Sequence, residues 1–267
     1  MNDVFISVLL GIVEGFTEFL PISSTGHLIL VNNFLHFTGE FANMFDIFIQ
    51  LGAILSVVVY FRKKLIPFGK NKSADEKNKV WILWKKTLVA VIPAILIGAT
   101  FGKHIQKLLF NPFVVAMALL IGGIVLLLIE RKKRPISIDS LSVLSYQTAF
   151  TIGLIQCLAM IPGTSRSAAT IIGAMLLGSS RLVAAEFSFY LAIPTMAAAS
   201  GYSLWKTGMM LSNREILLLT IGFTVSFLVA WAVIAGFMDY ISKKDFKVFG
   251  YYRIVLGLAV LIYFGLA

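Results

Sequence analysis

The side chains best suited to chemistry lie in two short polar segments within apolar sequence. The first segment begins with Glu14 and Glu18 and continues through Pro21 to His27. Carboxylates four residues apart lie on one face of a helix, and sites made only of oxygen ligands favour hard cations such as Mg²⁺ or Ca²⁺. We interpret Glu14 and Glu18 as metal ligands. The alternative is a pair of carboxylates hydrogen-bonded to backbone where the helix breaks.

The hydroxyl residues after these carboxylates indicate an anion site. Pro21 ends one helix, and Ser23, Ser24 and Thr25 can begin the next. A helix N-terminus offers unpaired N–H groups and a partial positive charge to an anion. His27 lies one turn further and can act as acid, base or nucleophile near neutral pH. A lone histidine in a membrane helix is otherwise often a buried structural residue.

The second polar segment, Pro162–Thr170, places one arginine among hydroxyls. Arg166 offers a planar, permanently charged fork for phosphate oxygens, and Ser165, Ser167 and Thr170 are candidate phosphate-binding residues beside it. The alternative is a buried Arg–Glu ion pair that only holds the two segments together. Carboxylates for a cation, hydroxyls, an imidazole and an arginine together favour phosphoryl transfer. The apolar setting indicates an amphiphilic phosphate as substrate.

The composition requires that membrane helices position these residues. The 267 residues are 58% hydrophobic and 13% charged, which excludes a water-soluble globular enzyme, a disordered chain and a collagen-like fibre. One cysteine, Cys157, excludes an intrachain disulfide. The net charge of +10 is interpreted as membrane topology rather than nucleic-acid binding. We expect no removable targeting segment, since Glu14 and Glu18 interrupt the first apolar run.

The apolar runs predict an all-α polytopic membrane protein with about six spanning helices. Two further pairs of short apolar pieces are each separated by a Pro/Gly/Ser/Thr break, which is typical of re-entrant helices whose polar backbone is sheltered by protein or a wet cavity. The predicted spans are Met44–Phe61, Trp81–Gly102, Leu109–Ile129, Leu182–Trp205, Ile216–Met238 and Tyr251–Ala267. The short pairs are Val4–Ile22 with Leu28–His36, and Thr148–Ile161 with Ala168–Gly178.

The two broken pairs also predict an internal repeat in one integral membrane domain. Gly11–Glu14 matches Gly153–Gln156, and the halves run approximately from 1 to 134 and from 135 to 267. Three spans per half make the halves inverted, so the two breaks meet at a midplane site. The alternative is a chance match of apolar sequence. Asp46 and Glu186, at similar places in the two halves, either support the site or cap span ends.

Lysine and arginine are strongly biased to alternate loops. The basic groups are Arg62–Lys86, with nine, Arg131–Arg134, with four, and Lys243, Lys244, Lys247 and Arg253; the other loops carry only Lys103, Lys107, Lys206 and Arg214. The positive-inside rule places the basic loops in the cytoplasm, so the first break enters from the outer face and the second from the cytoplasm. The basic loops also suit contact with anionic membrane lipid.

The two segments resemble the signature motifs of the bacterial undecaprenyl-diphosphatase family of the bacitracin-resistance type. The resemblance rests on Glu14–His27 and Pro162–Ser167 and extends over essentially the whole chain. It implies hydrolysis of undecaprenyl diphosphate to the monophosphate, which recycles the lipid carrier of cell-wall synthesis. It also implies a divalent cation and a site open to the outer face of the bacterial plasma membrane. The family's nucleophile would be Ser24 or His27, and its phosphate-binding arginine Arg166.

Two other classes remain open from the sequence. Inverted repeats and broken helices are equally typical of a secondary transporter or lipid flippase, although Glu14, Glu18 and His27 exceed what anion binding alone needs. The unrelated acid-phosphatase family of lipid phosphatases shares Ser-Thr-Gly-His and Ser-Arg, but its Lys-and-Arg motif and second His with Asp are missing. A homodimer is possible, and the chain gives no sign of isoprenoid length.

Overall fold

The computed structural model describes residues 3–68, 72–132, 134–207 and 211–265, and it contains helices and no strand among them. Six of these helices are long and apolar enough to cross a membrane. They confirm the predicted all-α polytopic class and overlap all six predicted spans. They are α3 (Glu40–Tyr60), α5 (Ala74–Leu109), α6 (Pro112–Arg131), α9 (Arg181–Thr207), α10 (Asn213–Lys243) and α11 (Lys247–Gly265).

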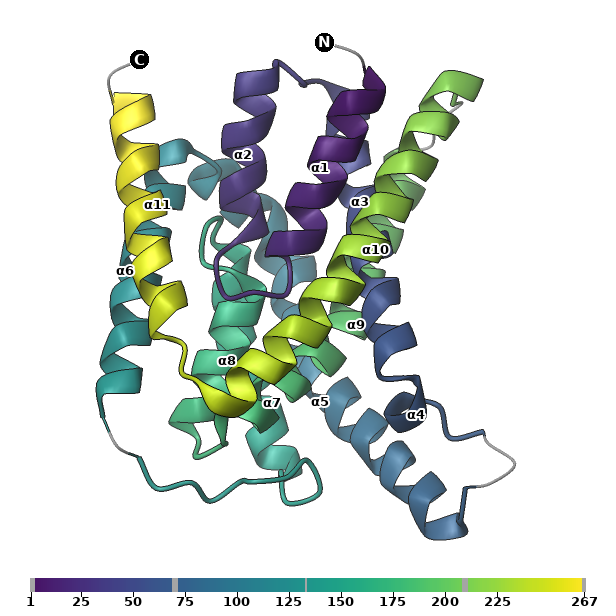
Figure 1. Ribbon diagram of the computed structural model, residues 1–267, viewed down its shortest axis with the longest axis vertical. Helices are drawn as coiled ribbons and strands as arrows, with labels where there is room; N and C mark the ends of the chain where they lie inside the picture. Colours follow the sequence, from purple (N-terminus) through teal and green to yellow (C-terminus); the bar gives the residue numbers. More distant parts are fainter. Residues whose placement is uncertain (1–2, 69–71, 133, 208–210, 266–267) are drawn as a thin grey trace.

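A pair of short helices precedes each set of three long ones. The first pair is α1 (Asp3–Thr17) and α2 (Ser24–Leu35). The second is α7 (Tyr146–Gln156), followed by the 3₁₀ turn Cys157–Met160, and α8 (Arg166–Leu176). A four-residue helix, α4 (Arg62–Leu65), follows α3. In Figure 1 the chain runs down α1 to the middle of the molecule and returns along α2. The entry of the two pairs from opposite membrane faces stays a prediction.

Both breaks end in the same unusual backbone conformation. Ser23 and Ser165, the residues before α2 and α8, have φ angles of 73° and 70°. Each serine hydroxyl accepts a hydrogen bond from the N–H three residues on, of Gly26 and of Ala168 respectively. The predicted capping by hydroxyl residues is therefore confirmed at α2, and α8 is capped in the same way. Two matching strained caps support the predicted repeat, whose boundary near residue 134 stays a prediction.

Close helix packing fixes the position of the short helices. A Cβ at Gly15 of α1 would lie 2.6 Å from the carbonyl oxygen of Ser226 in α10. A Cβ at Gly153 of α7 would lie 2.0 Å from the carbonyl oxygen of Ala90 in α5. Small residues let helix backbones approach closely in membrane proteins. These two contacts hold α1 against α10 and α7 against α5, so both short helices are fixed in position relative to long helices.

The connections after α3, α6 and α10 lie at the end of the molecule opposite to both termini (Figure 1). These are the basic loops of the sequence prediction, although Lys70 and Lys133 fall outside the described residues. One assignment is wrong. The sequence prediction groups Arg253 with the basic loops, but the residue lies inside α11 and is fully buried. The charge bias that gives the topology does not depend on it.

Candidate active site

The carboxylate of Glu18 joins the two breaks. Its Oε2 accepts a hydrogen bond from Ser24 Oγ at 2.5 Å, and its Oε1 accepts one from Arg166 Nη2 at 2.9 Å. Ser24 and Arg166 are the first residues of α2 and α8, so the N-termini of both helices meet at this carboxylate. The Glu18 N–H still donates to the carbonyl of Glu14 at 3.0 Å, which preserves the predicted helical spacing of the two glutamates.

Arg166 is held from several sides and its side chain is only 10% exposed. Its Nη1 donates to the carbonyl and the hydroxyl of Ser188 in α9, at 3.0 and 3.4 Å. Its guanidinium lies over the ring of Phe19, 5.6 Å from the centroid. The Arg–Glu ion pair foreseen from the sequence is therefore present. The Nε atom of Arg166 is buried and has no hydrogen-bond partner.

The other hydroxyls of the second break hold the backbone around Arg166. Ser167 Oγ donates to the carbonyl of Leu20 in the first break at 2.8 Å. Thr170 Oγ1 donates to Ser188 Oγ at 2.6 Å, and Ser165 Oγ lies 2.9 Å from Ser167 Oγ. The side chains of Ser167 and Thr170 are fully buried. Their binding of phosphate, and that of Ser23 and Thr25, stays a prediction.

His27 faces α11. Its Nδ1 lies 2.7 Å from the carbonyl oxygen of Ser23, and its Nε2 lies 2.7 Å from the hydroxyl of Tyr252. The two rings are stacked, with centroids 5.6 Å apart. Because a carbonyl only accepts, the neutral imidazole carries its proton on Nδ1, and Nε2 accepts from Tyr252. Both ring nitrogens are therefore engaged away from Glu18.

Glu14 is the least satisfied side chain of the site. It is fully buried, and neither carboxylate oxygen has a hydrogen-bond partner. The charged groups acting on it are Glu18, Asp46 and Arg166. Asp46 accepts from Asn32 Nδ2 at 2.7 Å through Oδ2, while its Oδ1 has no partner. Asp46 is a partly buried acidic group whose charge acts on Glu14, and its role in the site stays a prediction.

These unpaired oxygens fit a hard cation, because Mg²⁺ and Ca²⁺ bind carboxylate oxygens. Across the described residues, no group of three or more His, Cys, Asp or Glu side chains is placed to enclose a metal ion. Glu14 and Glu18 could therefore supply only part of a coordination sphere. This agrees with Mg²⁺ sites that use one or two carboxylates and complete the shell with substrate phosphate and water.

Glu186 has a structural environment. Its carboxylate forms an ion pair with Lys64 of α4 at 2.6 Å and also accepts from the hydroxyl of Tyr190. These contacts tie α4 to α9 on the side of the basic loops. The structure therefore supports the interpretation of Glu186 as a residue at the end of a span.

Three residues that the sequence prediction did not single out contact the site. Ser188 holds Arg166, Tyr252 holds His27, and Arg253 donates to the backbone of both breaks. The signal for Arg253 was available, since an ionisable residue within an apolar run is a functional candidate. Ser188 and Tyr252 carry no such signal, because isolated hydroxyls are common in membrane helices.

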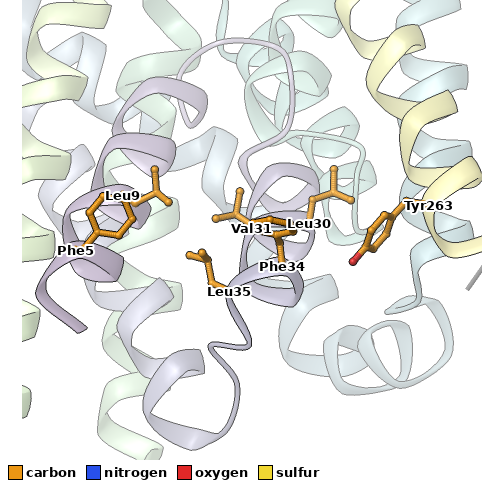
Figure 2. Close-up of a pocket in the computed structure, with 7 residues that line it drawn as sticks. All are labelled: Phe5, Leu9, Leu30, Val31, Phe34, Leu35 and Tyr263. Atoms are coloured by element: carbon orange, nitrogen blue, oxygen red, sulfur yellow. The ribbon is translucent and has the colours of Figure 1, made fainter. Parts of the chain in front are cut away.

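An apolar pocket of about 520 Å³ lies between α1, α2 and α11. Figure 2 shows Phe5 and Leu9 of α1 facing residues of α2, with Tyr263 of α11 on the other side. Its lining is Phe5, Leu9, Leu30, Val31, Phe34, Leu35 and Tyr263. Leu30 and Val31 follow His27 by one turn of α2, so the pocket lies one helical turn from His27.

Comparison with known proteins gives consistent matches. The model of the bacitracin resistance protein BacA family matches residues 7–259. Undecaprenyl-diphosphatase 1 of Clostridioides difficile is 52% identical, over 98% of this chain and 96% of the relative. The undecaprenyl-diphosphatase of Lachnoclostridium phytofermentans is 53% identical, over 97% of this chain and 96% of the relative. That of Enterococcus faecalis is 50% identical, over 96% and 95%.

Proposed function

Because the chain belongs to the bacitracin resistance protein BacA family, we propose that it hydrolyses undecaprenyl diphosphate at the site where its two breaks meet. The products are undecaprenyl phosphate and inorganic phosphate, which returns the lipid carrier to cell-wall synthesis. The observation that carries the location is the Glu18 carboxylate, which accepts from Ser24 and from Arg166 at once. The transporter alternative is not favoured, since the relatives named above are phosphatases.

In this proposal Ser24 is the nucleophile and Glu18 its general base. Ser24 Oγ attacks the terminal phosphorus while its proton passes to Glu18, to which it is already hydrogen-bonded. The bond from that phosphorus to the bridging oxygen breaks, and undecaprenyl phosphate leaves. Water then attacks the phosphoserine, and Glu18 returns the proton to Ser24 Oγ as phosphate departs. His27 is the weaker candidate, because Ser23 and Tyr252 occupy both of its nitrogens.

Arg166 and the two helix N-termini bind the phosphoryl group. Arg166 and Ser24 bind the same carboxylate, that of Glu18, which places the positive charge of the guanidinium beside the nucleophile. The first N–H groups of α2 and α8 add partial positive charge. A divalent cation held by Glu14 and Glu18 would neutralise diphosphate charge when bound. Removal of Glu14 would then leave the phosphoryl group bound less tightly.

The chain is a multi-pass membrane protein, and we assign it to the bacterial plasma membrane with the site open to the outer face. Three basic loops lie at the opposite end of the molecule from the termini. The positive-inside rule places those loops in the cytoplasm. The apolar pocket between α1, α2 and α11 suits the isoprenoid tail, because it is lined by hydrocarbon side chains and begins one turn beyond His27.

Phosphate release by the purified chain in detergent tests the proposal. Detergent micelles have no membrane sides, so transport or flipping produces no signal there. We expect phosphate from undecaprenyl diphosphate, and loss of it after treatment with a chelator that excess Mg²⁺ or Ca²⁺ reverses. Folded protein that binds the lipid without releasing phosphate would instead support a transporter or flippase.

A further inference from the structure

Arg253 is a buried cation that contacts both breaks. It lies in α11 and is 0% exposed. Its Nη1 donates to the carbonyl of Pro21 in the first break at 3.3 Å. Its Nη2 donates to the carbonyls of Gly163 and Thr164 in the second break, at 3.1 and 3.0 Å. A further bond at 3.1 Å reaches the carbonyl of Ala118 in α6.

Packing alone does not account for an arginine at this place. The ion pairs formed within the described part of the chain do not include Arg253, and its Nε has no hydrogen-bond partner. Burial of a charge without a counter-charge is costly unless hydrogen bonds compensate it. In this structure the compensation comes from the backbone carbonyls to which the guanidinium of Arg253 donates.

The guanidinium of Arg253 fixes the distance between the two breaks. Backbone carbonyls in a break have lost their helical partners and need donors at membrane depth. One rigid guanidinium plane supplies donors to both breaks, so it fixes the carbonyl of Pro21 relative to those of Gly163 and Thr164. The contact between Glu18 and Arg166 crosses the same gap.

We propose that Arg253 is a positioning residue, whose guanidinium sets the spacing between Ser24 on the first break and Arg166 on the second. This inference rests on the proposed phosphatase site. Misplacement of reacting groups by about 1 Å can cost about 100-fold in rate. Loss of the spacing should therefore lower kcat in protein that remains folded, without removing any group that touches substrate.

Gly122 of α6 provides a test that leaves Arg253 itself in place. A Cβ at Gly122 would lie 2.3 Å from Arg253 Nη2, so Gly122→Ala must displace the guanidinium while its charge remains. A matched control is Gly236→Ala in α10, where a Cβ meets nothing within 4 Å. Both changes replace a helical glycine by alanine, so their effects on helix propensity are alike.

The experiment measures kcat, KM and the melting temperature for both variants, alone and combined with Arg166→Lys. We expect Gly122→Ala to lower kcat by about 100-fold, with a melting temperature close to that of Gly236→Ala. In the Arg166→Lys background, where the fork is already lost, Gly122→Ala should reduce kcat by no more than about twofold. If Gly122→Ala instead caused a structural defect unrelated to Arg166, the kcat of the double variant would fall by the product of the two single losses.

The inference is overturned if Gly122→Ala retains the kcat of Gly236→Ala, or if its loss is fully multiplicative with Arg166→Lys. Should Gly122→Ala fail to fold, Arg253→Lys enters the same cycle, because a single ammonium cannot bridge the carbonyls of both breaks. Wild-type phosphate release in the same assay reports on the proposed function separately. Absence of activity in the wild-type chain would refute the proposed phosphatase function. Full activity of Gly122→Ala would refute only the proposed role of Arg253.

Discussion

Glu18 links the acidic motif of the first break to the arginine motif of the second. A hydrogen bond to a charged group is about twice as strong as a neutral one, and Glu18 accepts two such bonds, from Ser24 and Arg166. Removal of one partner of a buried pair leaves the other charge uncompensated. For any substitution at the Arg166–Glu18 pair, stability and turnover must therefore both be measured.

Replacement of Arg166 by lysine should abolish most turnover while the fold persists. A single ammonium cannot donate to Glu18 and to Ser188 while also meeting a phosphate oxygen. We expect kcat to fall by about 100-fold, the effect of losing one preorganised donor. The measurement is steady-state phosphate release at saturating lipid.

The control for this variant is Arg181→Lys. Arg181 also uses two guanidinium nitrogens, on Glu130, but lies at the start of α9 beside the basic loops. It should keep near-wild-type turnover. Comparable activity of Arg166→Lys and the wild type would show that Arg166 supplies charge alone.

Replacement of Glu14 by glutamine should stabilise the protein and weaken its metal dependence. The buried carboxylate has no hydrogen-bond partner and lies near Glu18 and Asp46, so its removal relieves like-charge repulsion. We expect a higher melting temperature in chelator, and loss of the further rise that Mg²⁺ or Ca²⁺ gives the wild type.

Thermal unfolding with and without the cation measures this effect. The control is Asp239→Asn, since Asp239 is exposed and pairs with Lys243 on the surface. An unchanged cation-induced rise in Glu14→Gln would contradict a metal site at Glu14, whatever the variant's activity.

At the scale of the elements, the breaks were the most predictable feature. Ser23 and Ser165 cap α2 and α8 because hydroxyls next to a break accept hydrogen bonds from free N–H groups. Both partners of each cap are close in the sequence, so local sequence is enough to predict it. The partners across the gap were not predictable. Ser188 and Tyr252 reach the site only through the packing of α9 and α11, to which local sequence gives no direct access.

Arg253 shows how a correct rule can be misapplied. Basic residues near span ends determine topology, but Arg253 lies within α11 and contacts both breaks. The predicted last span begins at Tyr251, so Arg253 lies close enough to its end to be grouped with the lysines before it. Its position within a predicted apolar run was the contrary signal.

The apolar pocket predicts a dependence on the length of the lipid. Val31→Phe adds bulk to a pocket already lined by Phe34 and Leu35. If the isoprenoid tail lies there, the loss of burial for about two methylene groups raises KM about tenfold for a long-chain diphosphate. KM for a diphosphate too short to reach the pocket should not change.

The comparison of undecaprenyl with a short prenyl diphosphate therefore tests tail placement. Val255→Phe is the control, because Val255 is exposed on α11 and does not line the pocket. An equal rise in KM for both lipids would place the tail elsewhere.

At the scale of the whole molecule, the account depends on orientation. The basic loops after α3, α6 and α10 lie at one end, and α2 begins at the break and runs toward the other. A single cysteine at Thr25, in a Cys157→Ser background, should react with an impermeant thiol reagent added outside intact spheroplasts. Substrate should protect it, because Thr25 is next to Ser24 on the first turn of α2.

The same reagent, applied to a cysteine on the predicted cytoplasmic face of the membrane, provides the control. A cysteine at the exposed Ser73, within the first basic loop, should react only after the cytoplasmic face is opened. Labelling of the Thr25 cysteine only under that condition would overturn both the topology and the outer-leaflet assignment.

The central claim is that Ser24, held by Glu18 beside Arg166, takes the terminal phosphate, and trapping of the phosphorylated enzyme tests it most directly. Wild-type protein would be mixed with undecaprenyl diphosphate carrying a radiolabelled terminal phosphate, quenched within one turnover and digested. The account predicts an acid-stable phosphoserine in the peptide that contains Ser24, absent from Ser24→Ala. Acid-labile label on His27, or phosphate release in a single turnover without any labelled protein, would contradict it.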